Sequence, residues 1–397
     1  MKVLWASPYL PLPVTTGGKR RIGSLMRKLS PRHEITLVAY DRGEIASARE
    51  ASRGLVHALH TVGRRPTKSP ANAVLWAVGP WPFMAVANGF NPGMVRLLRD
   101  AVNSIRPDVV HCEHFHLWHS MTRARLPGWP PIVLSQQGIE FLITERFATV
   151  PASGLLRAGL RLELAKARRW EVSACRAADA LIVVSQEDKR LLSEFVAAER
   201  ISVVENGVDS EEFHPPEGGI DPASSVMLFV GTFSFFGNRD ALHHLVYEIL
   251  PRVRQASPAA TLRVIGESPP PIVTEGVELL GSVPQVGPHL GQARLLIAPL
   301  RTGSGTKLKV LEAMACGIPF VTTSLGAEGI DRAHEAGIIA DDTDGLVEGA
   351  VRLLGDVELA RRLGLRGREI VTRCYSWDAS AHALEGAWEG VGHVCLR

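Results

Sequence analysis

Short apolar runs recur along the whole chain, and segments with helical spacing of apolar residues separate them. In the first half, the runs that predict strands lie at residues 2–6, 34–40, 109–112, 132–135 and 180–185. Helices are predicted there at 18–29, 92–105, 155–175 and 187–195. In the second half, the predicted strands lie at 226–231, 261–265, 277–280, 295–300 and 320–323, with helices between them. Strands that alternate with helices are typical of parallel sheets covered by helices on both faces.

The stretch from 295 to 323 predicts one strand, a glycine turn, a helix and a second strand. Its first residues, 295–300, form an apolar run that suits a buried parallel strand. After the glycine turn, Leu308, Leu311 and Ala315 have helical spacing. The stretch is therefore predicted to form one strand–helix–strand unit.

The ends of this helix also follow from residue types. Thr306 is expected to cap its start, and Gly317 is expected to take the left-handed conformation just past its end. Because Pro319 cannot continue the helix, the next strand is expected to begin near Phe320.

The chemistry of the same stretch indicates a ligand. Gly303 and Gly305 let the backbone approach a ligand closely, and the amides at a helix start favour an anion, most often a phosphate. Lys307 and Lys309 add positive charge, and the carboxylate of Glu312 can accept hydrogen bonds from sugar hydroxyls. Phosphate and hydroxyl groups together indicate a nucleotide. The alternative, a glycine turn that starts a helix and binds nothing, stays open at this point.

Composition adds limits to this picture. A chain of 397 residues, 46% hydrophobic and 21% charged, exceeds the size at which one core usually keeps growing, so two domains are expected. The net charge of +3 is too small to indicate nucleic acid as a partner. The five cysteines lack metal-binding spacing, which fits a reducing compartment. The first residues are expected to form a strand rather than a signal peptide, and no stretch approaches the length of a membrane span. We therefore expect a cytoplasmic protein.

The segment from Ser304 to Pro319, with SerLeuGlyAlaGluGly at 324–329, resembles the donor-binding segment of the retaining glycosyltransferase family 4. Other segments similar to that family are ValLeuTrpAlaSerPro at 3–8, ThrThrGlyGly at 15–18, AspValValHis at 108–111, AlaAspAlaLeuIleValValSerGlnGluAsp at 178–188 and GluAsnGlyValAsp at 205–209. The resemblance covers essentially the whole chain. It implies an α/β protein of GT-B fold, with two Rossmann-like domains whose parallel sheets face across a cleft. It also implies a nucleoside-diphosphate sugar as co-substrate, a hydroxyl acceptor, no further cofactor and no metal.

The expected domain boundaries combine this resemblance with a break in composition. The Pro- and Gly-rich segment 213–219 is interpreted as a linker. We expect an N-terminal acceptor-side domain at 1–212 and a nucleotide-sugar donor-binding domain at 213–375. The remaining residues, 376–397, are expected to form a helix that crosses back to the first domain.

The resemblance implies that loops of the second domain bind the donor. The expected donor-binding residues there are Gly231, Thr232, Asn238, Gly266, Val283, Arg301, Gly303, Ser304, Gly305, Thr306, Lys309, Leu311 and Glu312. The family usually carries an arginine and a lysine in the loop that here reads PheSerPhePheGlyAsn, so Lys309 is the first candidate to neutralise the diphosphate. The family also shows two glutamates separated by seven residues. Glu312 matches the second, expected on the ribose hydroxyls, whereas Ser304 replaces the first.

In the first domain, Gly18 precedes a basic helix start that is expected to face the diphosphate; the alternative is a basic surface turn. Where the family often has a histidine near the anomeric carbon, this chain has Gln137, and Glu140 follows as the acidic residue. The expected catalytic residues are Gln137, Glu140 and Lys309. Glutamine can bind a sugar hydroxyl but cannot shuttle a proton. Glu113 is an alternative carboxylate near the reacting centre.

Four histidines follow another first-domain strand, at positions 111, 114, 116 and 119. Without partnering Asp or Cys ligands they are a poor zinc site. His114 or His116 facing the acceptor is one interpretation, and core or surface histidines are the other.

Two segments suggest a hydrophobic acceptor or a membrane. Residues 75–90 are predicted to form a loop that exposes Trp76, Trp81, Phe83 and Met84, as expected for a lipid-linked acceptor. The helix from about residue 155 sets Arg157, Arg161 and Arg168 in a stripe beside Leu156, Leu160 and Leu164, which fits peripheral contact with the inner face of a membrane. Packing of this helix on the first sheet is the alternative, and co-sedimentation with anionic liposomes would separate the two.

These features together predict a retaining, metal-independent glycosyltransferase that moves a sugar from a nucleoside-diphosphate sugar to a hydroxyl acceptor. The acceptor would be a glycan, a lipid-linked glycan or a small molecule. A nucleotide-sugar epimerase of the same architecture and an inactive sugar-nucleotide-binding or scaffold protein are the alternatives. Hydride transfer is excluded because no GxGxxG follows the first strand.

Overall fold

The computed structural model describes residues 1–64, 66, 69–148 and 154–394, and the chain divides into two compact units. Unit 1 comprises Met1–Glu205 together with the chain from Asp378 onward, and unit 2 comprises Asn206–Trp377. The first division comes before the segment 213–219 that was interpreted as a linker. That segment lies inside unit 2, where Phe213 is buried in the core with 1% of its surface exposed.

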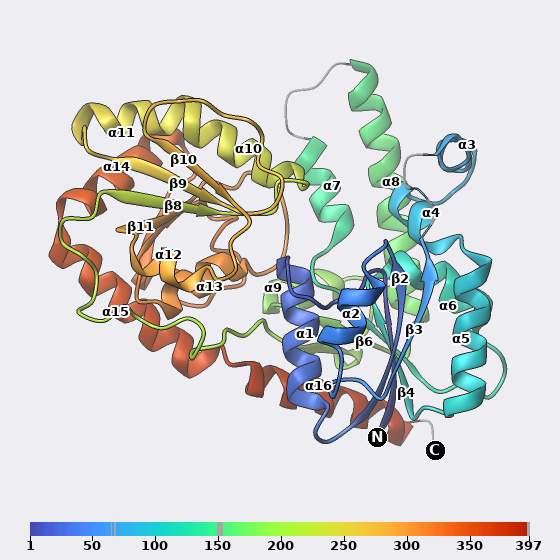
Figure 1. The fold of residues 1–397 in the computed structure, drawn as a ribbon. Coiled ribbons are helices and arrows are strands. Elements are labelled where there is room, and N and C mark those ends of the chain that lie inside the picture. The colour runs from blue at the N-terminus through green and yellow to red at the C-terminus, as the bar shows by residue number, and fades with distance from the viewer. Residues whose placement is uncertain (65, 67–68, 149–153, 395–397) are drawn as a thin grey trace. The chain divides into compact units, whose positions relative to one another are not determined.

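Unit 1 is built on a seven-stranded sheet in which every pair of neighbours is parallel (Figure 1). Its strands are β1 (Lys2–Ser7), β2 (Glu34–Asp41), β3 (Ala58–Gly63), β4 (Val109–Glu113), β5 (Ile132–Ser135), β6 (Ala180–Val183) and β7 (Ile201–Val203). Their spatial order is β3-β2-β1-β4-β5-β6-β7. The chain therefore changes its direction of travel across the sheet between β1 and β4, and loops at such a point form a natural binding crevice.

Helices connect these strands, and the two faces of the sheet carry different ones. The helices of unit 1 are α1 (Gly17–Leu29), α2 (Ile45–Ala51), α3 (Pro70–Val78), α4 (Phe83–Gly89), α5 (Pro92–Ile105), α6 (Trp118–Ala124), α7 (Glu140–Ala148), α8 (Gly154–Ala177), α9 (Gln186–Leu192) and most of α16 (Trp377–Val394). Val110 and Cys112 of β4 are buried in a core with residues of α5, α6 and α8. Because side chains alternate along a strand, His111 points to the other face, where it meets Trp388 of α16.

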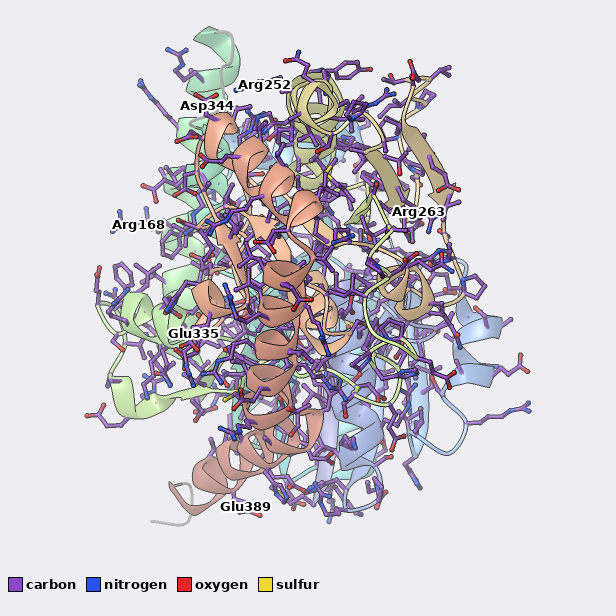
Figure 2. The ribbon with its side chains drawn as sticks, turned by 90° about the vertical axis from the view of Figure 1, so that its left-hand side faces the viewer. Arg168, Arg252, Arg263, Glu335, Asp344 and Glu389 are labelled. Carbon is purple, nitrogen blue, oxygen red and sulfur yellow. The ribbon has the colours of Figure 1, made fainter. Side chains whose placement is uncertain are left out.

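Unit 2 contains a six-stranded parallel sheet with the order β10-β9-β8-β11-β12-β13. Its strands are β8 (Val226–Val230), β9 (Thr261–Ile265), β10 (Val277–Gly281), β11 (Leu295–Ala298), β12 (Phe320–Thr322) and β13 (Gly337–Ile339). Its helices are α10 (Phe236–His244), α11 (Leu250–Ala256), α12 (Gly287–Gly291), α13 (Leu308–Ala315), α14 (Thr343–Gly355) and α15 (Val357–Cys374). An ion pair of 2.7 Å between Arg252 and Asp344 joins α11 to α14 (Figure 2). The order repeats that of unit 1, with the change of direction between β8 and β11.

All the predicted strands and the four predicted helices of unit 1 are present, with small differences at their ends. The sequence pattern missed β3, β7 and β13. Each of the three lies at the edge of its sheet and is only partly buried, so it lacks the continuous apolar run of a central strand.

The prediction of a loop at 75–90 is wrong, because this segment forms the end of α3 and all of α4. The Ser69 side chain caps α3 by accepting a hydrogen bond from the Asn72 amide, and Pro70 opens the helix. The four bulky residues expected to be exposed are partly buried. On α3 it is instead Val74 and Val78 that reach solvent, with 60% and 80% of their surfaces exposed.

α8 holds this apolar segment in place. The Glu163 carboxylate accepts hydrogen bonds from the Trp76 indole at 2.6 Å and from the Phe83 amide at 2.9 Å. Arg157, Arg161 and Arg168 are exposed on the same helix. Figure 2 labels Arg168. The side chain of Leu156 lies outside the described residues. None of the helices in the described ranges has the length and apolar character needed to cross a bilayer. Peripheral membrane contact stays a prediction.

Candidate functional site

The loops at the carboxyl ends of β8, β9 and β11 form the candidate donor site in unit 2. The loops after β8 and β9 cross in direct contact at Gly231 and Gly266. Gly266 has φ +141°, and a Cβ built on it would lie 1.7 Å from the Gly231 carbonyl oxygen. The backbone is anchored on both sides, since the Gly231 amide donates to Ile265 O and the Gly266 amide donates to Gly281 O. The absence of a side chain at Gly266 therefore allows the two loops to lie in direct contact, and their expected role in donor binding stays a prediction.

The turn before α13 and the first residues of the helix carry backbone donors that the described protein does not use. Gly303 and Gly305 have φ +129° and +70°, conformations that favour glycine. Within the described ranges, the amides of Gly305, Leu308 and Lys309 donate to no protein acceptor. Such amides at a helix start, together with the helix dipole, favour an anion.

The expected cap of this helix needs a correction. Thr306 does not cap α13, because its hydroxyl donates to Gly329 O at 3.4 Å, and the N-cap position is Lys307, which makes no side-chain capping bond. The predicted end of the helix is confirmed, with Gly317 at φ +70° and β12 beginning at Phe320. The Asn206 side chain binds the Thr306 carbonyl at 3.4 Å and so ties the start of unit 2 to the turn.

Lys309 is the cation at the centre of the site. Its Nζ donates to Asn238 Oδ1 at 2.9 Å and lies 4.7 Å from the centre of the Phe229 ring. Asn238 in turn donates to the Thr232 carbonyl at 2.9 Å, so α10 and the loop after β8 hold the lysine in place. Burial, and then the charge of Lys307, lower the pKa of Lys309 to about 7, although Glu312 opposes this shift.

Other expected donor residues lie around this centre. Glu312 is buried, with 7% of its surface exposed, close enough to influence the pKa of Lys309. Lys307 hydrogen-bonds the Gly305 carbonyl and lies 3.8 Å from Glu328, which places Glu328 at the same turn. Ser304 in the turn is partly buried.

Three further expected donor residues have side chains that are packed or paired within unit 2. Leu311 is fully buried in the core, so only its backbone could meet a ligand. Val283 is partly buried against the same core. Arg301 forms a bidentate ion pair with Asp240 of α10 at 2.9 and 2.6 Å, which neutralises the charge that was expected to serve the diphosphate.

In unit 1, side chains at the carboxyl ends of β1, β4 and β5 form a second cluster. Gln137 donates through Nε2 to Glu113 Oε2 at 3.1 Å, and Tyr9 hydrogen-bonds Gln137. A Cβ on Gly18 would lie 2.6 Å from the Tyr9 hydroxyl and 2.9 Å from Gln137 Oε1, so glycine lets α1 begin directly beside this cluster. The Tyr9 hydroxyl also lies 3.4 Å from His114 Nε2.

Glu113 is the buried carboxylate of this cluster, with none of its surface exposed. Burial opposes its ionisation, but the hydrogen bond from His111 and the charges of His111, His114 and Arg21 outweigh burial and lower its pKa. In contrast, burial and the charge of His116 lower the pKa of His114 to about 4, so this imidazole is neutral near pH 7. Glu113 is therefore a buried anion that accepts hydrogen bonds from His111 and Gln137.

Glu140 lies at the start of α7 and is held by a second buried carboxylate. Glu171 accepts hydrogen bonds from the Glu140 and Phe141 amides at 3.1 and 3.0 Å, and from Gln136 Nε2 at 3.0 Å. Burial raises the pKa of Glu171 to about 8. Burial also opposes ionisation of Glu140, but His116, 3.6 Å away, outweighs it and lowers the pKa of Glu140. Glu140 is thus the ionised carboxylate of this region.

The basic residues after Gly18 are mostly engaged within unit 1. Lys19 pairs with Glu44 at 2.8 Å. Arg21 is buried and donates to the carbonyls of Val204 and Glu205 at 2.8 and 3.1 Å, and burial lowers its pKa to about 10. The basic side chains expected to bind a diphosphate at this helix start are therefore largely paired or hydrogen-bonded within unit 1.

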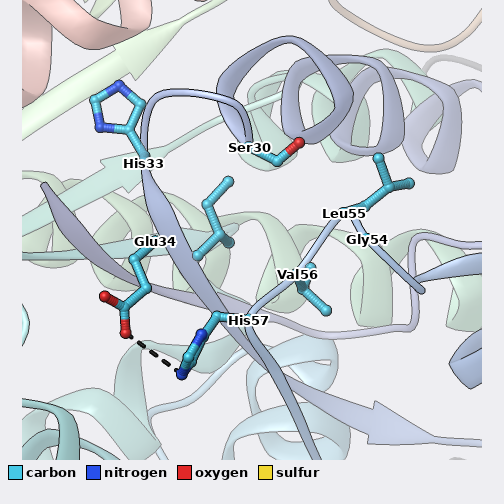
Figure 3. Close-up of a pocket in the computed structure, with 8 residues that line it drawn as sticks. Ser30, His33, Glu34, Gly54, Leu55, Val56 and His57 are labelled. Atoms are coloured by element: carbon cyan, nitrogen blue, oxygen red, sulfur yellow. Dashed lines mark ion pairs between the residues drawn. The ribbon is translucent and has the colours of Figure 1, made fainter.

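Two other features do not belong to the candidate site. The histidines of the 111–119 segment join no group of three or more His, Cys, Asp or Glu arranged to hold a metal in the described ranges. A hollow of about 270 Å³ lined by His33, Glu34 and His57 lies where β2 begins, at the amino end of the sheet (Figure 3). Parallel sheets bind ligands at the opposite, carboxyl end.

Sequence reasoning missed Tyr9, Glu171 and Trp388 as members of these networks, and it considered His111 only as part of a poor metal site or as a core or surface histidine. Tyr9 follows the first strand by two residues, so its place at a strand end was a usable signal. Trp388 and His111 are separated by 277 positions, and nothing local in the sequence joins them.

Comparison with known families gives the same two-part division. The family described as Glycosyltransferase Family 4 matches residues 15–212, and the family described as Glycosyl transferases group 1 matches residues 224–356. The two matches follow each other in the order expected for an acceptor-side and a donor-side domain.

Curated relatives carry similar names. The glycogen synthase of Mycobacterium tuberculosis is 26% identical over 300 residues, covering 70% of this chain and 68% of that protein. An exopolysaccharide phosphotransferase of Streptomyces coelicolor is 28% identical over 215 residues, covering 50% of this chain. The matched region spans only 22% of that longer protein.

Among solved structures, Anabaena HepE in complex with UDP-glucose superposes with a TM-score of 0.72 at 12% identity, covering 98% of this chain and 100% of HepE. At this identity the likeness shows the fold alone. The two parallel sheets, the two family matches and the relatives together show that this chain belongs to glycosyltransferase family 4 and has the GT-B fold.

Proposed function

We propose that the protein transfers a sugar from a nucleoside-diphosphate sugar to a hydroxyl acceptor, with retention of configuration and without a metal ion. The observation that carries the proposal is the start of α13, where the amides of Gly305, Leu308 and Lys309 donate to no protein acceptor in the described ranges and Asn238 holds the ammonium group of Lys309. A diphosphate is the ligand that such donors suit best. Glu312 beside them suits the ribose hydroxyls.

The proposed chemistry needs little from acid–base side chains. The bond between the anomeric carbon and the diphosphate breaks, and the acceptor oxygen forms a new bond on the same face of the sugar. A phosphate oxygen of the leaving group takes the acceptor's proton, so Gln137, which cannot shuttle a proton, does not prevent the reaction. Lys309 and the three amides stabilise the negative charge that develops on the leaving group. The ionised Glu140 is proposed to lie near the positive charge that develops on the sugar.

The acceptor is proposed to be a glycan or a lipid-linked glycan. The names of the relatives support this choice, since one is named an exopolysaccharide phosphotransferase and another a GDP-mannose-dependent alpha-(1-6)-phosphatidylinositol monomannoside mannosyltransferase. The nucleotide base is left to experiment, because the neighbour HepE carries UDP-glucose whereas this mannosyltransferase depends on GDP-mannose.

An inactive sugar-nucleotide-binding protein is the second candidate. The observation that favours it is the glutamine at position 137, which donates its amide hydrogen to Glu113 and offers no titratable group. Both candidates predict nucleotide binding in unit 2, and only turnover separates them.

A panel of donors tests the proposal. Incubation with UDP, GDP, ADP and dTDP sugars should release one nucleotide in the presence of acceptor extracts. The Glu312→Ala variant should abolish release, because the ribose loses its carboxylate partner, whereas Glu358→Ala, an exposed carboxylate on α15, should behave as wild type. Binding without turnover for every acceptor would favour the inactive binder, and no binding of any donor would contradict both candidates.

Donor affinity should depend on pH through Lys309. The free ammonium group has a pKa of about 7, and a bound diphosphate raises it. Below pH 7 the lysine is already charged, so affinity is at its plateau; above pH 7 binding must take up a proton, and affinity falls by up to about tenfold per pH unit. Titration calorimetry from pH 6 to 9 with the donor identified in the panel measures this, since its diphosphate has no monoester group titrating near pH 6.

The matched control for this experiment is Lys309→Arg. A guanidinium stays charged throughout this range, so the variant should bind with a flat pH profile. A wild-type profile that is equally flat would show that Lys309 does not meet the diphosphate.

A further inference from the structure

A chain of buried hydrogen bonds connects α16 to the Gln137 cluster in unit 1. The Trp388 indole Nε1 donates to His111 Nδ1 at 3.2 Å. His111 Nε2 lies 3.1 Å from Glu113 Oε1, and the other carboxylate oxygen of Glu113 accepts the Gln137 amide at 3.1 Å. Trp388, His111 and Glu113 have at most 1% of their surfaces exposed, so water does not compete for these bonds.

The direction of every hydrogen bond in this series follows from its first donor, the indole of Trp388. An indole nitrogen only donates, so His111 Nδ1 must be the unprotonated acceptor. The proton of the neutral imidazole therefore sits on Nε2 and is donated to Glu113 Oε1. A carboxylate only accepts, so Glu113 Oε2 must receive the Nε2–H of Gln137. This fixes the Gln137 amide with its carbonyl oxygen turned toward the Tyr9 hydroxyl and Gly18.

We propose that Trp388 and His111 are positioning residues, which act through Glu113 to hold the carbonyl oxygen of Gln137 where it accepts a hydrogen bond from a hydroxyl of the transferred sugar. Helix α16 thereby sets the direction of the hydrogen bonds that reach Gln137. The role given to Gln137 rests on the proposed function, whereas the direction of the bonds does not.

The packing around His111 provides a matched control. Trp5 is fully buried on the same face of the sheet, its ring lies 4.1 Å from that of His111, and it meets Trp388 edge to face at 5.8 Å. Its indole nitrogen is buried and has no hydrogen-bond partner in the described ranges. Trp5→Phe and Trp388→Phe therefore remove similar bulk from the same place, but only Trp388→Phe removes the donor to His111.

The first readout is the tautomer of His111, measured by ¹⁵N NMR on histidine-labelled protein without substrate. The signal is assigned by its absence in the His111→Gln variant. Wild type and Trp5→Phe should show the proton on Nε2, and Trp388→Phe should lose this preference. A proton on Nδ1 in the wild type, or an unchanged tautomer in Trp388→Phe, would overturn the proposal.

The second readout is turnover of the nucleotide sugar. Trp388→Phe should lower kcat by roughly fivefold to tenfold, the size expected when one buried hydrogen bond is lost. The KM for the donor should stay the same, because unit 2 holds the diphosphate, and Trp5→Phe should keep its kcat. Equal kcat in the two variants would overturn the positioning role. If the wild type turns over no donor, the proposed function fails. The NMR result still decides the direction of the hydrogen bonds from Trp388 to Gln137.

Discussion

Methionine in place of Lys309 should lower kcat for sugar transfer by roughly 10²–10³-fold, the range seen when one preorganised electrostatic group is removed from a transition state. Lys309 is the cation that Asn238 and the Phe229 ring hold beside the unused amides of the turn before α13. Methionine keeps most of the side-chain volume and removes the charge, so the variant should fold. Steady-state kinetics with saturating donor measures the change.

The control for this prediction is Arg252→Met. It also exchanges a charged side chain of unit 2 for methionine, but Arg252 is exposed on α11 and pairs with Asp344 away from the site. Its kcat should equal that of the wild type. A Lys309→Met variant with undiminished kcat would show that the amides alone support the leaving diphosphate.

Alanine in place of Gly266 should destabilise unit 2 by more than about 4 kcal/mol, a loss that single substitutions rarely reach. The added Cβ would lie 1.7 Å from the Gly231 carbonyl oxygen, and φ of +141° is unfavourable for any other residue. The obstacle is backbone held in place by its own hydrogen bonds, so it cannot rotate aside as a side chain would. Urea unfolding, followed with a probe in unit 2, measures the loss.

Gly281→Ala separates the two causes of this loss, which are the clash of the added Cβ with backbone and the unfavourable positive φ. Gly281 also has a positive φ, +67°, but no heavy atom lies within 4 Å of an added Cβ. Its substitution should cost only the conformational strain, about 1–2 kcal/mol. If the two alanine variants unfold at the same urea concentration, the crossing of the loops is not the reason for the glycine at 266.

The sequence pattern located the elements that lie deep in each unit. Central strands such as β8 and β11 are continuous apolar runs, and α5 begins at its predicted proline and ends at its predicted residue, because these features depend on local spacing. Edge strand β13 has only three residues, two of them partly exposed, and carries little local signal. The segment 75–90 was assigned to a loop because its prolines and glycines outweighed the capping signal of Ser69 before Pro70.

For the candidate site, too, the sequence predicted the local features and missed the contacts between distant residues. The glycines, lysines and glutamate of the turn before α13 are close in sequence, so their types and spacing predicted a shared site. What each side chain contacts depends on distant residues. Arg301 was available in the sequence as a cation, but Asp240 neutralises it in the structure. Gln137 was interpreted as a departure from the family, and only the fold shows it oriented by Glu113.

The discontinuity of unit 1 affects how the protein is made. A ribosome synthesises the chain from the N-terminal side, so β1 to β7 emerge before any residue of unit 2. Trp388 of α16 emerges only after unit 2. Until α16 has been synthesised, His111 lacks its hydrogen-bond donor Trp388, although all strands of the sheet have already been made. Unit 1 is thus begun before unit 2 but is completed only when α16 has followed unit 2 out of the ribosome.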